Sequence, residues 1–124
     1  MLDTHALLWW VFDSPDLSDG AADTIARADA VLVSAVSAYE ITLKHTLGKL
    51  PEAGVVARDV GATVAAEGFV MLSVTPEHAE AAGRLPTHHR DPFDRLLAAQ
   101  ALLEDLDLVS VDRHFDPWGV RRTW

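Results

Sequence analysis

Three short apolar segments constrain the fold of this chain most strongly, because none of them alternates between apolar and polar residues. They are VLVSA at 31–35, FVMLSV at 69–74 and LVSV at 108–111. Strands that are buried on both faces of a parallel sheet have this continuous apolar character. Segments with helical patterns lie between them, and such alternation favours a parallel sheet covered by helices on both faces. The sequence therefore predicts an α/β fold, a three-layer α/β/α sandwich with a central, mostly parallel sheet.

The other elements are predicted from capping residues, prolines and glycines. Residues 1–3 have the character of a strand end, so either the chain starts further upstream or the sheet tolerates a very short first strand. The remaining boundaries follow from helix start and stop signals. Helices are expected at 4–12, after Ser18, at 37–47 ended by Gly48, at 51–66 before Gly68, at 76–83 and from Pro92, with a last short element from Gly119.

Composition narrows the class of protein. A chain of 124 residues that is 49% hydrophobic and 23% charged is expected to form one globular domain, over 1–124, around a single core. The absence of cysteine excludes disulfides, thiol catalysis and cysteine zinc sites. No apolar run approaches the roughly 20 residues that span a bilayer, and the N-terminus lacks the basic region of a signal peptide. We therefore expect a cytoplasmic protein that does not bind membranes.

The net charge of −9 argues against nucleic-acid binding, which usually requires a basic surface. The last third of the chain is nevertheless rich in arginine and histidine. An acidic protein can still bind phosphates if cations fill an acidic pocket and arginines face the nucleic-acid backbone. Arg90, Arg95 and Arg113 flank the acidic residues considered next and are candidates for such a rim.

Two aspartates follow predicted strands directly. Asp3 comes after the first strand and Asp112 after LVSV. Ligand sites in open α/β sheets lie outside the carboxyl ends of the strands, and neighbouring strands are about 4.8 Å apart. The two carboxylates are therefore close enough to share one cation. The alternative for Asp3 alone is a helix cap or a turn.

Glu40 lies on a helix face that is otherwise apolar, since Val36, Leu43 and Leu47 share its spacing. A carboxylate on the face toward the sheet is costly to desolvate unless it is paired or binds a metal. The alternative is an ion pair with Lys44, one turn further on, with the face turned toward solvent.

HHRDPFDRLLAAQALL at 88–103 places two aspartates in the first turn of a helix. Asp91 stands at the N-cap position, with Pro92 in the first turn. Asp94 instead precedes the apolar face, where it either interacts only with the helix dipole or points toward the other acids. The adjacent His88 and His89 are a poor pair for one metal ion, and a loop contact with solvent or substrate is the preferred interpretation.

Together, Asp3, Glu40, Asp94 and Asp112 would repel one another without a cation. Hard divalent ions such as Mg²⁺ or Mn²⁺ favour oxygen ligands and commonly act on phosphates. Two such ions can hold both the attacking and the leaving oxygen of a phosphoryl displacement. The four acids therefore predict a nuclease or another phosphoryl-transfer enzyme, with these residues both binding metal and acting in catalysis.

Four motifs, in order, resemble the PIN-domain proteins of the VapC toxin type. They are LDTHALLWW, YEITLKHTLGKL, HRDPFDRLLAAQA and LVSVDRHF followed by WGV, and they extend over nearly the whole chain. The family usually has a few more residues before LDTH, which complete the first strand. The family's four acids fall on Asp3, Glu40, Asp94 and Asp112.

The resemblance implies a magnesium-dependent endoribonuclease, with Mn²⁺ as a possible substitute, that acts as the toxin of a type II toxin–antitoxin pair. It also implies a homodimer that binds a VapB-type antitoxin. Hydrolysis of RNA by a metal-activated water should leave a 5′-phosphate and a 3′-hydroxyl. The alternatives are a Mg²⁺-dependent phosphatase or phosphoacceptor domain, and a non-catalytic module that binds RNA or a partner. The first usually needs a lysine after a late strand, and none follows LVSV or VMLSV.

Overall fold

The computed structural model describes residues 1–124 and contains one parallel sheet built around a very short first strand. Leu2 forms parallel bridges to Val33 on one side and to Val109 on the other, and so joins two strand pairs. The resulting order is β2–β1–Leu2–β3–β4. The strands are β1 Leu32–Ser34, β2 Val70–Leu72, β3 Leu108–Val109 and β4 Arg122–Thr123. The expectation of a parallel sheet is confirmed.

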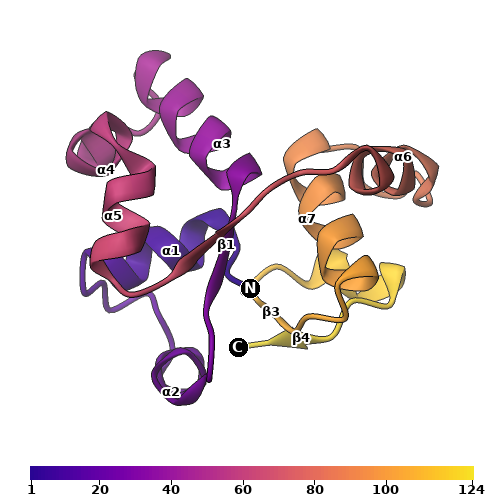
Figure 1. Cartoon of the computed structure of the whole chain (residues 1–124), viewed down its shortest axis with the longest axis horizontal. Coiled ribbons are helices and arrows are strands. Elements are labelled where there is room, and N and C mark those ends of the chain that lie inside the picture. The colour runs from indigo at the N-terminus through magenta and orange to yellow at the C-terminus, as the bar shows by residue number, and fades with distance from the viewer.

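Helices cover both faces of this sheet, as Figure 1 shows. No helix is long and apolar enough to cross a bilayer. The α-helices are α1 Thr4–Val11, α2 Asp19–Arg27, α3 Ala35–Thr46, α4 Gly54–Arg58, α5 Val60–Ala66, α6 Pro76–Arg84 and α7 Pro92–Leu103, and the 3₁₀ helices are η1 Pro51–Ala53 and η2 Arg113–Trp118.

The sheet separates two apolar clusters, where the sequence predicted a single core. One cluster joins α1, α2, α4 and α5 to β1, with Leu7, Ile25 and Val64 among its buried residues. The other joins α7 and η2 to the opposite side, with Leu97 and Phe115 fully buried. This is the three-layer α/β/α arrangement that the sequence predicted, with α1, α4 and α5 on one side and α6 and α7 on the other (Figure 1).

Two predicted helix boundaries were wrong, and both errors come from polar caps. The helix expected from residue 37 begins at Ala35, because the Ser34 hydroxyl accepts a hydrogen bond from the Val36 amide at 3.0 Å. The helix expected over 51–66 is broken into η1, α4 and α5. Asp59 has an extended φ of −157° and caps α5 through the Ala62 amide. A short polar side chain that bonds the backbone in this way favours a cap over a helix interior.

Candidate active site

Asp3 and Asp112 lie at the carboxyl ends of neighbouring strand positions, because Leu2 pairs with Val109. Asp3 is only 4% exposed, and its Oδ1 accepts a hydrogen bond from the Ala6 amide at 2.7 Å, which caps α1. Asp112 is partly buried at the start of η2, and its amide donates to the Ser110 hydroxyl. Asp3 is thus both a cap and a strand-end carboxylate, so the two interpretations of this residue are compatible.

Glu40 is 5% exposed on α3 and forms an ion pair of 2.7 Å with Lys44 Nζ. Glu40 is therefore both buried and ion-paired, although the sequence presented these two states as alternatives. The predicted apolar face is correct only at its start, since Val36 is buried but Leu47 is 58% exposed. The face that meets the core turns instead toward Ile41.

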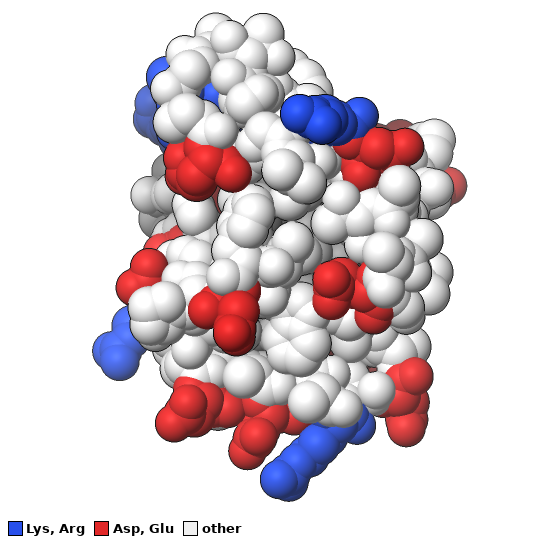
Figure 2. All heavy atoms as spheres, turned by 90° about the vertical axis from the view of Figure 1, so that its left-hand side faces the viewer, with Lys and Arg blue, Asp and Glu red and all other residues white.

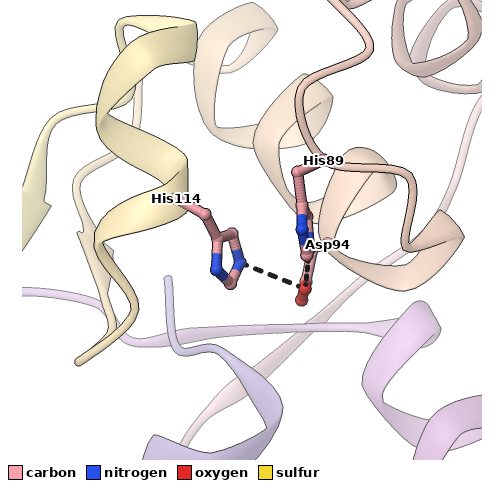
Figure 3. A group of neighbouring side chains, drawn as sticks. All are labelled: His89, Asp94 and His114. Atoms are coloured by element: carbon pink, nitrogen blue, oxygen red, sulfur yellow. Dashed lines mark hydrogen bonds and ion pairs between the residues drawn. The ribbon is translucent and has the colours of Figure 1, made fainter.

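Asp91 and Asp94 have different surroundings in the first turn of α7. Asp91 Oδ1 accepts hydrogen bonds from the amides of Phe93 and Asp94, which confirms its predicted role as the N-cap. Asp94 Oδ2 lies 2.8 Å from His89 Nε2 and 3.1 Å from His114 Nε2 (Figure 3). Asp94 therefore makes side-chain contacts that interaction with the helix dipole alone does not explain.

The four predicted acids line one polar pocket of about 160 Å³ that has no hydrophobic residue in its wall. The strand ends supply Asp3 and Asp112, α3 supplies Glu40, and α7 supplies Asp94. Segments far apart in the sequence thus converge on one small volume. The complete lining is Asp3, Thr4, His5, Glu40, Lys44, Asp91, Asp94 and Asp112.

Comparison with known proteins identifies the family of this chain. A family model of the PIN domain matches residues 1–117. The chain belongs to the PIN-domain family. Ribonuclease VapC22 of Mycobacterium tuberculosis is 32% identical over 114 residues, which cover 91% of this chain and 86% of that protein. This PIN domain is therefore of the VapC type, as the four sequence motifs predicted.

A solved structure supports the fold of this PIN domain independently. The crystal structure of VapBC2 from Rickettsia felis, bound to a DNA fragment from its promoter, matches with a TM-score of 0.69. The match covers 100% of this chain and 98% of the other at 16% sequence identity. At that identity the match shows the fold alone, and it confirms the PIN-like α/β architecture.

Burial of the acids in this PIN domain changes their ionisation. Desolvation by burial raises the pKa of Asp3 above its ordinary value, and Asp112 adds repulsion, while Ser110, the Ala6 amide and His5 oppose the rise. Burial likewise raises the pKa of Asp94, with repulsion from Asp91 and Glu40, while His89 and His114 oppose it. The pocket therefore lacks enough positive charge of its own to stabilise all its carboxylates.

The raised pKa of Asp3 gives a pH-dependent prediction for the metal-free protein. A group with a raised folded-state pKa contributes stability that is present below its unfolded pKa and lost as pH rises through the folded pKa. Asp3→Asn keeps a side-chain oxygen for capping α1 but has no carboxyl group to ionise. We expect the stability of Asp3→Asn relative to the natural protein to increase between about pH 4 and about pH 7. Urea unfolding of both proteins in a chelator, at each pH, measures their free energies of unfolding. A difference in free energy between the two proteins that is the same at both pH values would contradict the prediction.

Four residues at or beside the pocket were not assigned to it from the sequence, namely Thr4, His5 and Lys44, which line it, and His114, which contacts Asp94. Lys44 appeared there only as a partner for Glu40, and His114 only as part of a basic region. The sequence does contain a clue to Lys44 and His114. Lys44 lies one helical turn after Glu40, and His114 lies two residues after Asp112. His88 does not join His89 at Asp94; its ring lies against Trp118, at 4.8 Å between ring centroids.

The predicted arginine rim is only partly available to phosphates. Arg95 is only partly buried, but its guanidinium is already occupied, since it donates to the carbonyls of Leu85, Pro86 and His89 and lies 5.9 Å from the Trp118 ring. Arg90 and Arg113 are exposed. On the face that carries α4 and α5, acidic side chains stand in separate groups with basic ones toward the edges (Figure 2). That face has no continuous basic surface.

Proposed function

We propose that this chain is a metal-dependent endoribonuclease that acts as the toxin of a toxin–antitoxin pair. One observation carries the proposal: four carboxylates from separate segments line one small polar pocket at the carboxyl ends of parallel strands. Similarity to Ribonuclease VapC22 across most of both chains supports RNA as the substrate. We propose that residues 1–124 act as a single nuclease domain.

The donors of the pocket fit a hard divalent cation. Every proposed ligand offers carboxylate oxygen, which Mg²⁺ and Mn²⁺ prefer. Burial raises the pKa of Asp3 and Asp94, as expected for carboxylates whose negative charge is incompletely compensated. Lys44 is the only lysine or arginine in the lining, and it already pairs with Glu40. We propose that Asp3, Glu40, Asp94 and Asp112 hold Mg²⁺, for which Mn²⁺ can substitute.

The protein's own groups fix where these ligands stand. The Ala6 amide orients Asp3, and Asp112 follows β3 with its own amide bonded to the Ser110 hydroxyl. The Lys44 ammonium holds Glu40, and the cap at Asp91 fixes the helix turn that carries Asp94. A divalent cation bound there would lower the pKa of a coordinated water and would stabilise the negative charge that builds on the phosphate in the transition state. The proposal therefore requires no histidine as a general base, and hydrolysis should leave 5′-phosphate and 3′-hydroxyl ends.

Substrate choice separates this proposal from its alternatives. The purified protein is incubated with Mg²⁺ and either structured RNA or a small phosphomonoester. We expect internal cleavage of the RNA and no release of phosphate from the monoester. Release of phosphate from the monoester with intact RNA would support a phosphatase instead. Binding of RNA without cleavage, by protein that is folded and loaded with metal, would support a non-catalytic module.

We further propose that this chain forms a homodimer and binds a VapB-type antitoxin. The fold is shared with a chain of the VapBC2 structure from Rickettsia felis. An antitoxin that inserts an arginine or lysine into the acidic pocket would stabilise the carboxylates in place of metal. Lys44 already makes such a contact from within the chain.

Toxicity in cells tests the partner proposal. Expression of this chain alone should arrest growth, and co-expression of the adjacent antitoxin gene should restore growth and give a stable complex on purification. Growth that continues at verified levels of folded protein would contradict the toxin assignment.

A further inference from the structure

Two histidines from separate segments face one oxygen of Asp94. His89 comes from the loop before α7 and His114 from η2, and both rings point toward the carboxylate (Figure 3). The rings are stacked, with centroids 3.9 Å apart and planes inclined by 22°. One nitrogen from each ring and one carboxylate oxygen all lie within 4.8 Å of one another. Three atoms that could bind a metal thus lie close together beside the acidic pocket, whose lining includes Asp94.

The hydrogen bonds of this cluster leave one buried nitrogen unsatisfied. His89 Nε2 bonds Asp94 Oδ2 at 2.8 Å. His114 Nε2 lies 3.1 Å from the same oxygen, but it has no hydrogen-bond partner despite its burial. Buried polar atoms in folded proteins normally have a partner. A metal cation bound by the ring nitrogens would give His114 Nε2 the partner that it lacks.

The donor atoms select the type of cation. Two imidazole nitrogens with one carboxylate oxygen suit Zn²⁺ and related transition-metal ions. Mg²⁺ instead prefers oxygen ligands and gives up its water reluctantly. Three protein ligands with a fourth position open to water is a common arrangement for zinc. The set is therefore chemically distinct from the all-carboxylate donors of the acidic pocket.

The surroundings restrict the movement of both histidines. The His114 ring lies 4.6 Å from that of the fully buried Phe115, and the His89 ring lies 5.8 Å from that of Trp118. Arg95 also donates to the His89 carbonyl at 3.1 Å. Ligands held in place by their neighbours lose less freedom when a metal binds. The cluster is thus partly organised before any cation arrives.

We propose that His89, Asp94 and His114 form a transition-metal site, with Zn²⁺ as its cation, beside the acidic pocket and sharing Asp94 with it. Binding of Zn²⁺ here requires neither RNA nor nuclease activity, so it is testable whether or not the chain cleaves RNA.

Titration calorimetry with ZnCl₂ on the full, metal-free chain tests the site, and Co²⁺ provides a second probe through its visible absorption. We expect His89→Gln and His114→Gln each to weaken Zn²⁺ binding by at least about 10-fold, the smallest effect typical of residues that only orient a ligand. His88→Gln is the matched control, because the His88 ring lies against Trp118 and reaches the site only through the His114 carbonyl at 3.2 Å, a contact that a glutamine amide can also make. His88→Gln should bind Zn²⁺ as the natural protein does. Thermal melting establishes that each variant is folded.

Two results would overturn the site. One is unchanged Zn²⁺ affinity in either folded histidine variant. The other is a loss of Zn²⁺ affinity in Asp3→Asn as large as that in the histidine variants, which would place the ion in the acidic pocket. If one histidine variant fails to fold, the other still decides the question. If the protein cleaves RNA but does not bind Zn²⁺, the zinc site is ruled out and the proposed function still stands.

Discussion

Asp94→Asn is expected to lower Mg²⁺-dependent RNA cleavage by roughly 10²–10³-fold, the size of effect seen when one charge-stabilising group is removed from a transition state. The substitution is nearly isosteric but removes a negative charge from the proposed metal ligands. Burial already raises the pKa of Asp94, so loss of its charge should not destabilise the metal-free fold. The assay is the initial rate of RNA cleavage with Mg²⁺ in the absence of Zn²⁺, beside a thermal melt in chelator.

Asp91→Asn is the matched control for that substitution. It changes the same residue type three positions earlier and keeps an oxygen that can accept the hydrogen bonds now made by Asp91 Oδ1. Because Asn caps helices about as well as Asp, both stability and cleavage should stay close to natural values. Asp91→Ala should lose about 1 kcal/mol of stability and keep most activity at low temperature. If Asp91→Asn abolishes cleavage and Asp94→Asn does not, the two roles are reversed.

Mg²⁺ is expected to raise the melting temperature of this protein by about 10 °C at 100 times its dissociation constant. At that ratio, binding to the folded state alone adds roughly 2.7 kcal/mol, and a domain of this size shifts by about 3–5 °C for each kcal/mol. The physical source is relief of repulsion among the acids of the pocket. Differential scanning calorimetry with and without MgCl₂ measures the shift.

Ionic strength is the control for the Mg²⁺ experiment. NaCl at matched ionic strength screens surface charges in general and should give a much smaller shift. Glu40→Gln removes one proposed ligand and should reduce the effect of Mg²⁺ while leaving that of NaCl unchanged. Equal shifts with the two salts would count strongly against a metal site.

The sequence predicted those features of this PIN domain that depend on local patterns. Continuous apolar segments gave the parallel sheet, and the pair Asp91-Pro92 gave the start of α7. Position after a strand indicated Asp3 and Asp112, since the carboxyl ends of parallel strands meet at one edge. The family resemblance grouped these acids with Glu40 and Asp94, but their convergence depends on the order of the strands, which was not predicted and comes from the structure.

Features that depend on tertiary contacts were not predictable in the same way. The break at Asp59 arises because one side chain caps α5, and a helical pattern does not reveal that choice. The place of His114 at Asp94 depends on how η2 packs against α7, and no spacing between His89 and His114 encodes it. Arg95 was a candidate phosphate ligand until the fold showed its guanidinium bound to backbone carbonyls.

The chemical ends of the cleavage products reveal whether the acidic pocket hydrolyses RNA with a divalent cation. End-labelled structured RNA is incubated with the purified protein in Mg²⁺ or in chelator, and the products are analysed for their termini. We expect cleavage only with Mg²⁺, with 5′-phosphate and 3′-hydroxyl ends. Cleavage that continues at the same rate in chelator, or that leaves cyclic phosphate ends, would contradict this expectation.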